Sequence, residues 1–177
     1  MSELFSIQLQ NRQQQGRDGV WLDLPTTTEQ VQAALRQIGI SSDNPQGLFI
    51  SGYFAEEEKR FAIPYNMVLA SNVDELNFLA SRLETLSTGE RAELNAALQA
   101  PQSELFSIGR ITDFPENVDY YVHLPDVRGP AQLGDYYLNR SGMVDMPDEW
   151  KGGINTAQFG RFVAQQEPVS YTHLTLP

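Results

Sequence analysis

The chain has no cysteine, only two lysines and only two histidines among its 177 residues. Without cysteine it forms no disulfide, no thiolate metal site and no cysteine nucleophile. So few lysines leave no basic stripe for nucleic-acid phosphates, so we expect no direct binding to nucleic acid. No apolar run approaches the roughly 20 residues that cross a membrane, and the first ten residues lack the basic and apolar regions of a signal peptide. We therefore expect a cytoplasmic protein.

Negative charge is abundant instead, because 23 acidic residues face 12 basic ones and give a formal net charge of −11. Such a charge often serves solubility alone. It also suits a partner protein that is itself basic. Composition leaves both interpretations open.

The first segment, residues 1–63, is predicted to be a small α+β domain. Apolar residues at largely alternating positions predict a hairpin: Leu4, Ile7 and Leu9, then Val20, Leu22 and Leu24. Thr26 and Glu29 have the spacing of a capping box before a helix that Gly39 closes. A further strand is expected over residues 48–54.

The middle segment, residues 64–102, is predicted to be a helical domain. One helix carries a single apolar stripe: Val73, Leu76, Leu79, Leu83 and Leu86. Ser87 and Glu90 have capping-box spacing for a second helix, which Pro101 ends. The stripe is too short for a sustained coiled coil, so a small helical core is expected.

The third segment, residues 103–168, is predicted to be another α+β domain. It opens with SELFSI, a repeat of residues 2–7, but a single match without matching continuation is weak evidence for duplication. NVDYYVHL at 117–124 alternates like a strand, with Val118, Tyr120 and Val122 on one face. Residues 131–140 predict a helix capped by Gly142, and a last helix is expected around Phe159 and Val163.

The last nine residues, VSYTHLTLP at 169–177, resemble the translated read-through of a sequencing-library adaptor. We interpret them as not native and exclude them from the expected fold. On this interpretation the natural C-terminus is missing, and His123 is the only biological histidine.

Catalytic chemistry finds little support in the sequence. His123 with Asp126 or Asp135 is a conceivable acid/base pair, but it has no nucleophile or orienting partner, so no catalytic residue is predicted. No hydrolase, metalloprotease, phosphate-loop or dinucleotide-binding motif is present. Two acidic clusters, 56–58 and Asp145 with Asp148 and Glu149, lack calcium-loop spacing and are better explained as solvated faces. We predict neither a metal nor a cofactor.

The acids of the third segment are dispersed and do not converge. Nine acids and three arginines lie between Glu104 and Glu149, a local net charge of −6. Carboxylates one helical turn or strand repeat apart lie on the order of 5–7 Å from one another, a spacing that can imitate a phosphate backbone. The predicted partner-binding acids are Asp113, Glu116, Asp119, Asp126, Asp135, Asp145, Asp148 and Glu149.

A series of motifs then resembles the ArdA antirestriction family in order and spacing. The series runs GVWLDLP, VDELNFLASRLETL, DYYVHL, LGDYYLNRSG, VDMP and INTAQFGRFV. It covers nearly the whole chain to about Phe162. The chain departs from the pattern at Arg140, where the family usually carries an acid.

The resemblance implies an elongated α+β protein of three small domains that forms a homodimer through its C-terminal domain. Family members are carried by plasmids and conjugative elements, and they imitate bent B-form DNA to occupy the DNA-binding groove of type I restriction-modification enzymes. The family's antirestriction motif corresponds to Leu133, Gly134, Asp135, Tyr136, Tyr137 and Gly142. The same residues also suit helix packing or an interface.

An alternative of another class remains, in which the chain is an acidic interaction or regulatory module without DNA mimicry. Acids in a continuous stripe favour the mimic, and acids scattered over all faces favour the module.

Overall fold

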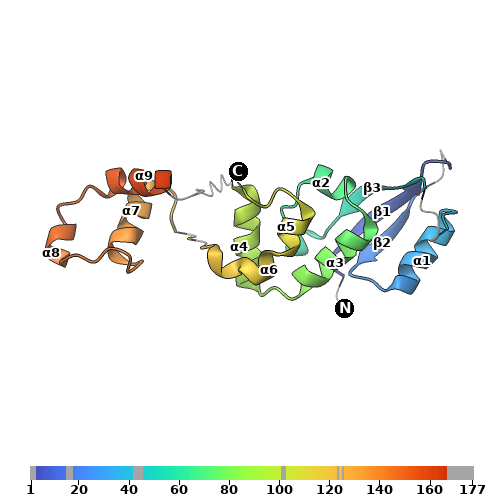
Figure 1. Cartoon of the computed structure of the whole chain (residues 1–177), viewed down its shortest axis with the longest axis horizontal. Helices are drawn as coiled ribbons and strands as arrows, with labels where there is room; N and C mark the ends of the chain where they lie inside the picture. Colours follow the sequence, from blue (N-terminus) through green and yellow to red (C-terminus); the bar gives the residue numbers. More distant parts are fainter. Residues whose placement is uncertain are drawn as a thin grey trace. The chain divides into compact units, whose positions relative to one another are not determined.

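The computed structural model describes residues 3–14, 18–41, 46–100, 103–122, 124 and 126–166. They form two compact units. The N-terminal unit comprises residues 1–98 and 104–121, and the C-terminal unit comprises residues 99–103 and 122–177. Figure 1 labels the elements of each unit.

The N-terminal unit contains an antiparallel sheet in the order β2-β1-β3. Strand β1 spans Phe5–Asn11, β2 spans Val20–Leu24 and β3 spans Leu48–Phe54. Ile7 pairs with Leu22, and the β1–β3 register shifts between Gln8 and Leu9. The predicted hairpin and third strand are confirmed, because alternation puts one face of each strand into the core.

Helix α1 spans Thr28–Gln37, one residue later than the predicted cap implied. Thr27, not Thr26, is the N-cap, and its partner in the capping box is Gln30, not Glu29. The Thr26 backbone N–H donates to Asn77 Oδ1 at 2.7 Å, so a tertiary contact holds the residue that local spacing suggested as the cap. Gly39 closes the helix at φ +70° as predicted.

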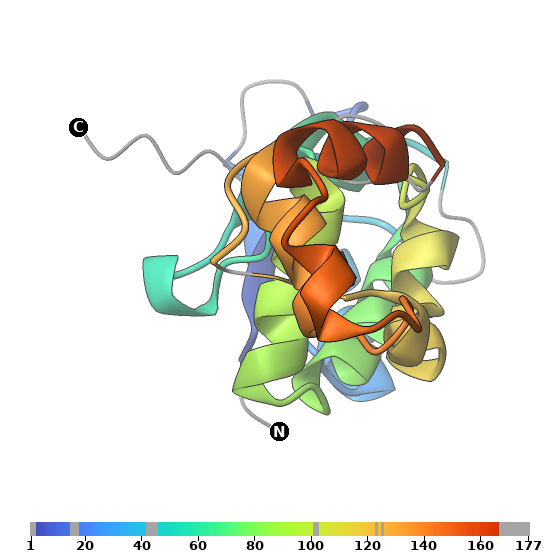
Figure 2. The ribbon, with the colours of Figure 1, turned by 90° about the vertical axis from the view of Figure 1, so that its left-hand side faces the viewer.

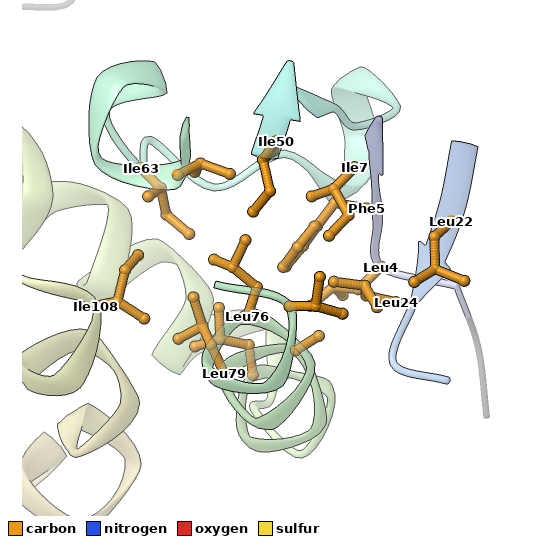
Figure 3. Packing of buried hydrophobic residues seen from close by; sticks show 14 of the residues in the cluster. Leu4, Phe5, Ile7, Leu22, Leu24, Ile50, Ile63, Leu76, Leu79 and Ile108 are labelled. Atoms are coloured by element: carbon orange, nitrogen blue, oxygen red, sulfur yellow. The ribbon is translucent and has the colours of Figure 1, made fainter. Parts of the chain in front are cut away.

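Further helices contribute buried residues to the core on one face of the sheet. They are α2 (Tyr65–Leu69), α3 (Val73–Glu84), α4 (Thr88–Gln99), α5 (Ile108–Thr112) and α6 (Phe114–Asn117), with short 3-10 turns η1 (Glu57–Lys59) and η2 (Val118–Tyr120). Figure 3 shows Leu76, Leu79 and Ile108 facing strand residues such as Ile7. Since the middle helices pack on this core, the three-domain division is not confirmed.

The strand predicted at 117–124 is wrong, because none of the residues of this range that the structure describes lies in a strand. Val118 lies in η2, and Tyr121 packs on Phe114 with ring centroids 4.9 Å apart in the N-terminal unit. Val122, predicted to share one face of the strand with Val118, is 71% exposed, while Leu124 packs in the C-terminal unit. The alternation therefore marks the passage between two cores and not a strand in one sheet.

The C-terminal unit contains α7 (Pro130–Asn139), α8 (Asp148–Lys151) and α9 (Thr156–Gln166). Figures 1 and 2 show α9 lying across α7. The helix predicted at 131–140 and the last helix are confirmed. The described residues of this unit contain no strand, so the expected α+β character belongs to the chain as a whole through its N-terminal sheet. The segment 169–177 lies outside the described residues.

Candidate partner-binding surface

The predicted antirestriction motif occupies α7 and the turn after it. Leu133 is 1% exposed and belongs to a small cluster with Val127 and Val163. Tyr136 and Tyr137 are half-buried against the same cluster, with their rings edge to face at 5.6 Å. The inner face of the motif therefore packs α7 against the rest of its unit, which is the helix-packing role that the sequence also suggested.

The turn after α7 is closed by backbone and hydroxyl groups. The backbone N–H groups of Arg140 and Ser141 both donate to the Tyr136 carbonyl, at 2.8 and 2.9 Å. The Ser141 hydroxyl donates to the Tyr137 carbonyl at 2.8 Å. Gly142 follows at φ +71°, a left-handed conformation that glycine adopts without steric cost.

Asp135 lies on the outer side of α7, where two neighbours hold its carboxylate. Asn139 Nδ2 donates to Asp135 Oδ1 at 2.8 Å, and Arg140 Nη2 lies 3.3 Å from Asp135 Oδ2. The Arg140 guanidinium also lies 5.9 Å from the Tyr136 ring centroid. Asp135 is therefore the motif's acid, and a local cation already offsets its charge.

The eight predicted partner-binding acids all reach solvent. Seven are exposed, and Asp135 is half-exposed. They divide between the units: Asp113, Glu116 and Asp119 belong to the N-terminal unit, and Asp126, Asp135, Asp145, Asp148 and Glu149 belong to the C-terminal unit. No more than five therefore belong to one unit.

Local cations pair with three of these acids. Besides Asp135, Glu116 accepts from Arg82 of α3 at 2.7 Å, and Asp148 lies 2.9 Å from Lys151 Nζ. The hydrogen bond and charge of Lys151 lower the pKa of Asp148, so this carboxylate stays ionised.

The other five acids have no ion-pair partner among the residues that the structure describes: Asp113, Asp119, Asp126, Asp145 and Glu149. Their oxygens are free to meet cations of another molecule. Within the described ranges, no three acids or histidines converge as a metal site would need. That statement covers Asp145, Asp148 and Glu149, which the sequence suggested as a cluster.

His123, the histidine of the conceivable acid/base pair, lies outside the described residues. Its candidate partner Asp126 is exposed, and the other, Asp135, is engaged by Asn139 and Arg140. Nothing in these contacts gives either carboxylate an enclosed site in which to transfer a proton.

The distribution of charge between the units was missed by the sequence reasoning. The N-terminal unit has 17 acids and 8 basic residues, a net charge of −9, whereas the C-terminal unit has 6 and 4, a net charge of −2. The segment 104–149 looked strongly acidic because its first part, through Asp119, folds with the N-terminal unit. A count of charged residues along the N-terminal half of the sequence would have indicated that most of the net negative charge lies in this unit.

Comparison with protein-family models matches residues 15–175 to the antirestriction protein ArdA. The chain belongs to the ArdA antirestriction family. The matched range spans the whole α7 motif of this family member and all eight acids, and it runs into segment 169–177. Comparison with curated proteins gives no match. In the described parts of this family member, no helix has the length and apolar character to cross a membrane.

Proposed function

We propose that this ArdA family member inhibits type I restriction-modification enzymes by occupying their DNA-binding groove in place of DNA. The family match over residues 15–175 carries the proposal, because it makes the chain an antirestriction protein. In this mechanism the protein binds the enzyme and thereby excludes DNA from the groove. It performs no catalysis.

The exposed carboxylates supply the physical basis of the competition. A restriction enzyme presents Lys and Arg side chains to DNA phosphates, and carboxylates can occupy the same cations. The five unpaired acids suit this role best, because their oxygens need not first leave a partner in their own chain. Charge attraction of this kind accelerates association and weakens as salt rises.

We also propose that the protein acts as a homodimer through its C-terminal unit. Four large apolar side chains of that unit are exposed: Val122 and Met143 at 71%, Trp150 at 67% and Phe162 at 58%. Burying such side chains against a second copy is favourable, and aromatic residues are enriched in interfaces. The half-buried tyrosines of α7 belong to the same small unit.

Competition tests the proposed function directly. The full chain is titrated into a type I methyltransferase bound to labelled DNA, at low and at moderate salt, with DNA release followed by fluorescence anisotropy. We expect displacement that fades as salt rises. Sedimentation of the same sample reports whether the protein is dimeric.

Two results would count against the proposal. No displacement by a folded dimer at either salt would exclude DNA mimicry toward that enzyme and favour the acidic interaction module. Displacement that does not change with salt would show binding without carboxylates in the place of phosphates.

A further inference from the structure

A groove lies along β2 in the N-terminal unit, between this strand and α1. Its volume is about 460 Å³. Among the residues that the structure describes, its lining contains two carboxylates, Glu3 and Asp23, together with Trp21 and hydroxyl, amide or apolar side chains, and no lysine or arginine. The groove is therefore negative in a unit whose net charge is −9.

Trp21 borders this groove from the open face of the sheet. Its neighbour in the register is Gln8 of β1, which in turn pairs with Gly52 of β3. A Cβ on Gly52 would lie 3.0 Å from Trp21 Cη2, so the indole extends over β1 and rests against β3. Trp21 is nevertheless 50% exposed, so part of its ring remains open to solvent.

Arginine guanidinium groups lie over four other aromatic rings of this chain. Arg110 lies 4.6 Å from the Phe106 centroid, and three further pairs lie within 5.9 Å: Arg12 with Phe49, Arg91 with Phe61, and Arg140 with Tyr136. Among the described residues, no cation lies over Trp21. Indole is the aromatic ring that attracts cations most strongly, so Trp21 can accept a cation from another molecule.

Asp23 stands two residues from Trp21 on the same side of β2, as the alternation of a strand requires. The Ser6 hydroxyl donates to Asp23 Oδ1 at 2.6 Å. This bond orients the carboxylate and leaves Oδ2 without a partner among the described residues. The indole of Trp21 and this oriented carboxylate therefore project from the same face of the sheet.

We propose that this site, formed by Trp21, Asp23 and Glu3, binds an arginine side chain of a partner protein. A guanidinium is planar, so it can stack on the indole and donate to a carboxylate at once. An ammonium is a compact and strongly hydrated charge that gains less from stacking. The site should therefore prefer arginine to lysine.

The identity of the partner rests on the proposed function: it is the restriction-modification enzyme, whose DNA-binding surface is basic. The dispersed acids then provide general attraction, and the Trp21 site provides one specific anchor. Buried or half-buried aromatic and arginine contacts of this kind dominate many interfaces.

The site is tested first without any enzyme. The probe is a blocked glycine–arginine–glycine tripeptide, titrated into the ¹⁵N-labelled full chain while the two indole N–H signals are followed by NMR. We expect the Trp21 signal to shift and saturate. The lysine tripeptide should bind roughly two- to fivefold more weakly, and the neutral citrulline tripeptide should leave the signal unmoved.

Trp150 is the matched internal control. It directly follows Asp148 and Glu149, so general attraction of cations to an indole beside carboxylates would move its signal too. Equal shifts of Trp21 and Trp150, or equal responses to arginine and citrulline, would overturn the proposal.

Two variants complete the peptide test. Asp23→Asn should weaken arginine binding roughly two- to fivefold, and Trp21→Leu should abolish the response of the β2 amides. Unchanged arginine binding by Trp21→Leu, in a chain with native NMR dispersion, would also overturn the site.

The DNA competition assay then separates the site from the function. Trp21→Leu should weaken displacement roughly two- to fivefold with an unchanged salt slope, because no charge is removed. If the unmodified chain displaces no DNA, the proposed function fails while the peptide result stands. If it displaces DNA and Trp21→Leu is equally potent, Trp21 is not the anchor for that enzyme.

Discussion

Gly134 of α7 and Gly160 of α9 lie against each other where the two helices cross. A Cβ on Gly134 would overlap the Thr156 carbonyl and lie 3.0 Å from the Gly160 nitrogen. A Cβ on Gly160 would overlap the Pro130 carbonyl and lie 2.8 Å from the Gly134 nitrogen. The two backbones therefore touch without side chains between them, and this contact holds together a unit with few buried residues.

Gly134→Ala and Gly160→Ala should each destabilise the C-terminal unit. A methyl group cannot fit between the two backbones, so the helices must separate, which costs roughly 1–3 kcal/mol of unfolding free energy. Urea unfolding followed by the fluorescence of Trp150, in a Trp21→Phe background, measures this unit selectively.

Gly152→Ala is the matched control in the same unit. Gly152 has helical angles, φ −62° and ψ −19°, and the nearest atom to a Cβ there is 4.0 Å away. We expect no loss of stability. If the Gly134 variant is as stable as the Gly152 variant, the close crossing does not exist in solution.

The unpaired acids should matter more for DNA competition than the paired ones. Two double variants of the C-terminal unit remove the same charge: Asp145→Asn with Glu149→Gln, and Asp135→Asn with Asp148→Asn. The first pair has free oxygens, whereas the second is held by Arg140 and Lys151. We expect the first to weaken competition roughly two- to fivefold more than the second.

The measurement is the concentration of protein that displaces half of the bound DNA, at two salt concentrations. The salt slope should fall for the first double variant. Equal losses in both would mean that only the net charge of the unit counts.

The Ser87 cap of α4 should make stability depend on pH through Glu90. Hydrogen bonds from the Ser87 hydroxyl and backbone N–H lower the pKa of Glu90 below its ordinary value of 4.5. A lowered folded-state pKa contributes stability that is present above 4.5 and is lost as pH falls through the folded-state value.

Ser87→Ala should therefore raise the pKa of Glu90 and flatten the acid side of the stability profile. Carboxyl chemical shifts during an acid titration measure the first effect, and urea unfolding at several pH values measures the second. Thr88→Ala, one residue along at an exposed position, should leave the pKa unchanged. An identical pKa in both variants would contradict the role of the cap.

The Tyr53 hydroxyl of β3 is buried and has no hydrogen-bond partner among the described residues. Burial raises the pKa of Tyr53 from 10.0 to about 12, although nearby Arg60 opposes the shift. Tyr53→Phe should be neutral or stabilising at pH 7, because no hydrogen bond within the chain is lost.

The difference in free energy of unfolding between the unmodified chain and Tyr53→Phe should change at alkaline pH. Because the folded-state pKa is raised, stability linked to Tyr53 is intact below pH 10 and is lost between pH 10 and about 12. The phenylalanine variant should lack this loss in urea unfolding experiments. A strong destabilisation at pH 7 would reveal an unseen partner of the hydroxyl.

Local signals in the sequence were sufficient for many of the elements. Alternation placed Ile7 and Leu22 on one face of a hairpin, and the glycine after a helix located the ends of α1 and α7. These features depend on neighbours in the chain, so residue spacing reveals them. The exposure of the predicted acids was also foreseeable, since charged groups avoid burial.

Contacts between distant residues could not be foreseen in this way. Arg82 pairs with Glu116, and Gly134 meets Gly160, only because helices that are separate in sequence pack together. Which acids remain unpaired, and that Trp21 rests on Gly52 beside a groove, also depend on that packing.

The repeated hexapeptide SELFSI shows separately what local sequence determines and what contacts between distant residues determine. In both copies the leucine and the isoleucine are buried: Leu4 and Ile7 in the first, Leu105 and Ile108 in the second. Yet Phe5 begins strand β1 and is 3% exposed, whereas Phe106 precedes helix α5 and is 68% exposed. The sequence by itself determined that the leucine and the isoleucine are buried in a core, because burial of apolar area follows from their chemistry. The tertiary structure decided that the first copy enters a strand and the second leads into a helix, because the first has β2 and β3 as pairing neighbours and α5, which the second copy begins, packs on α3.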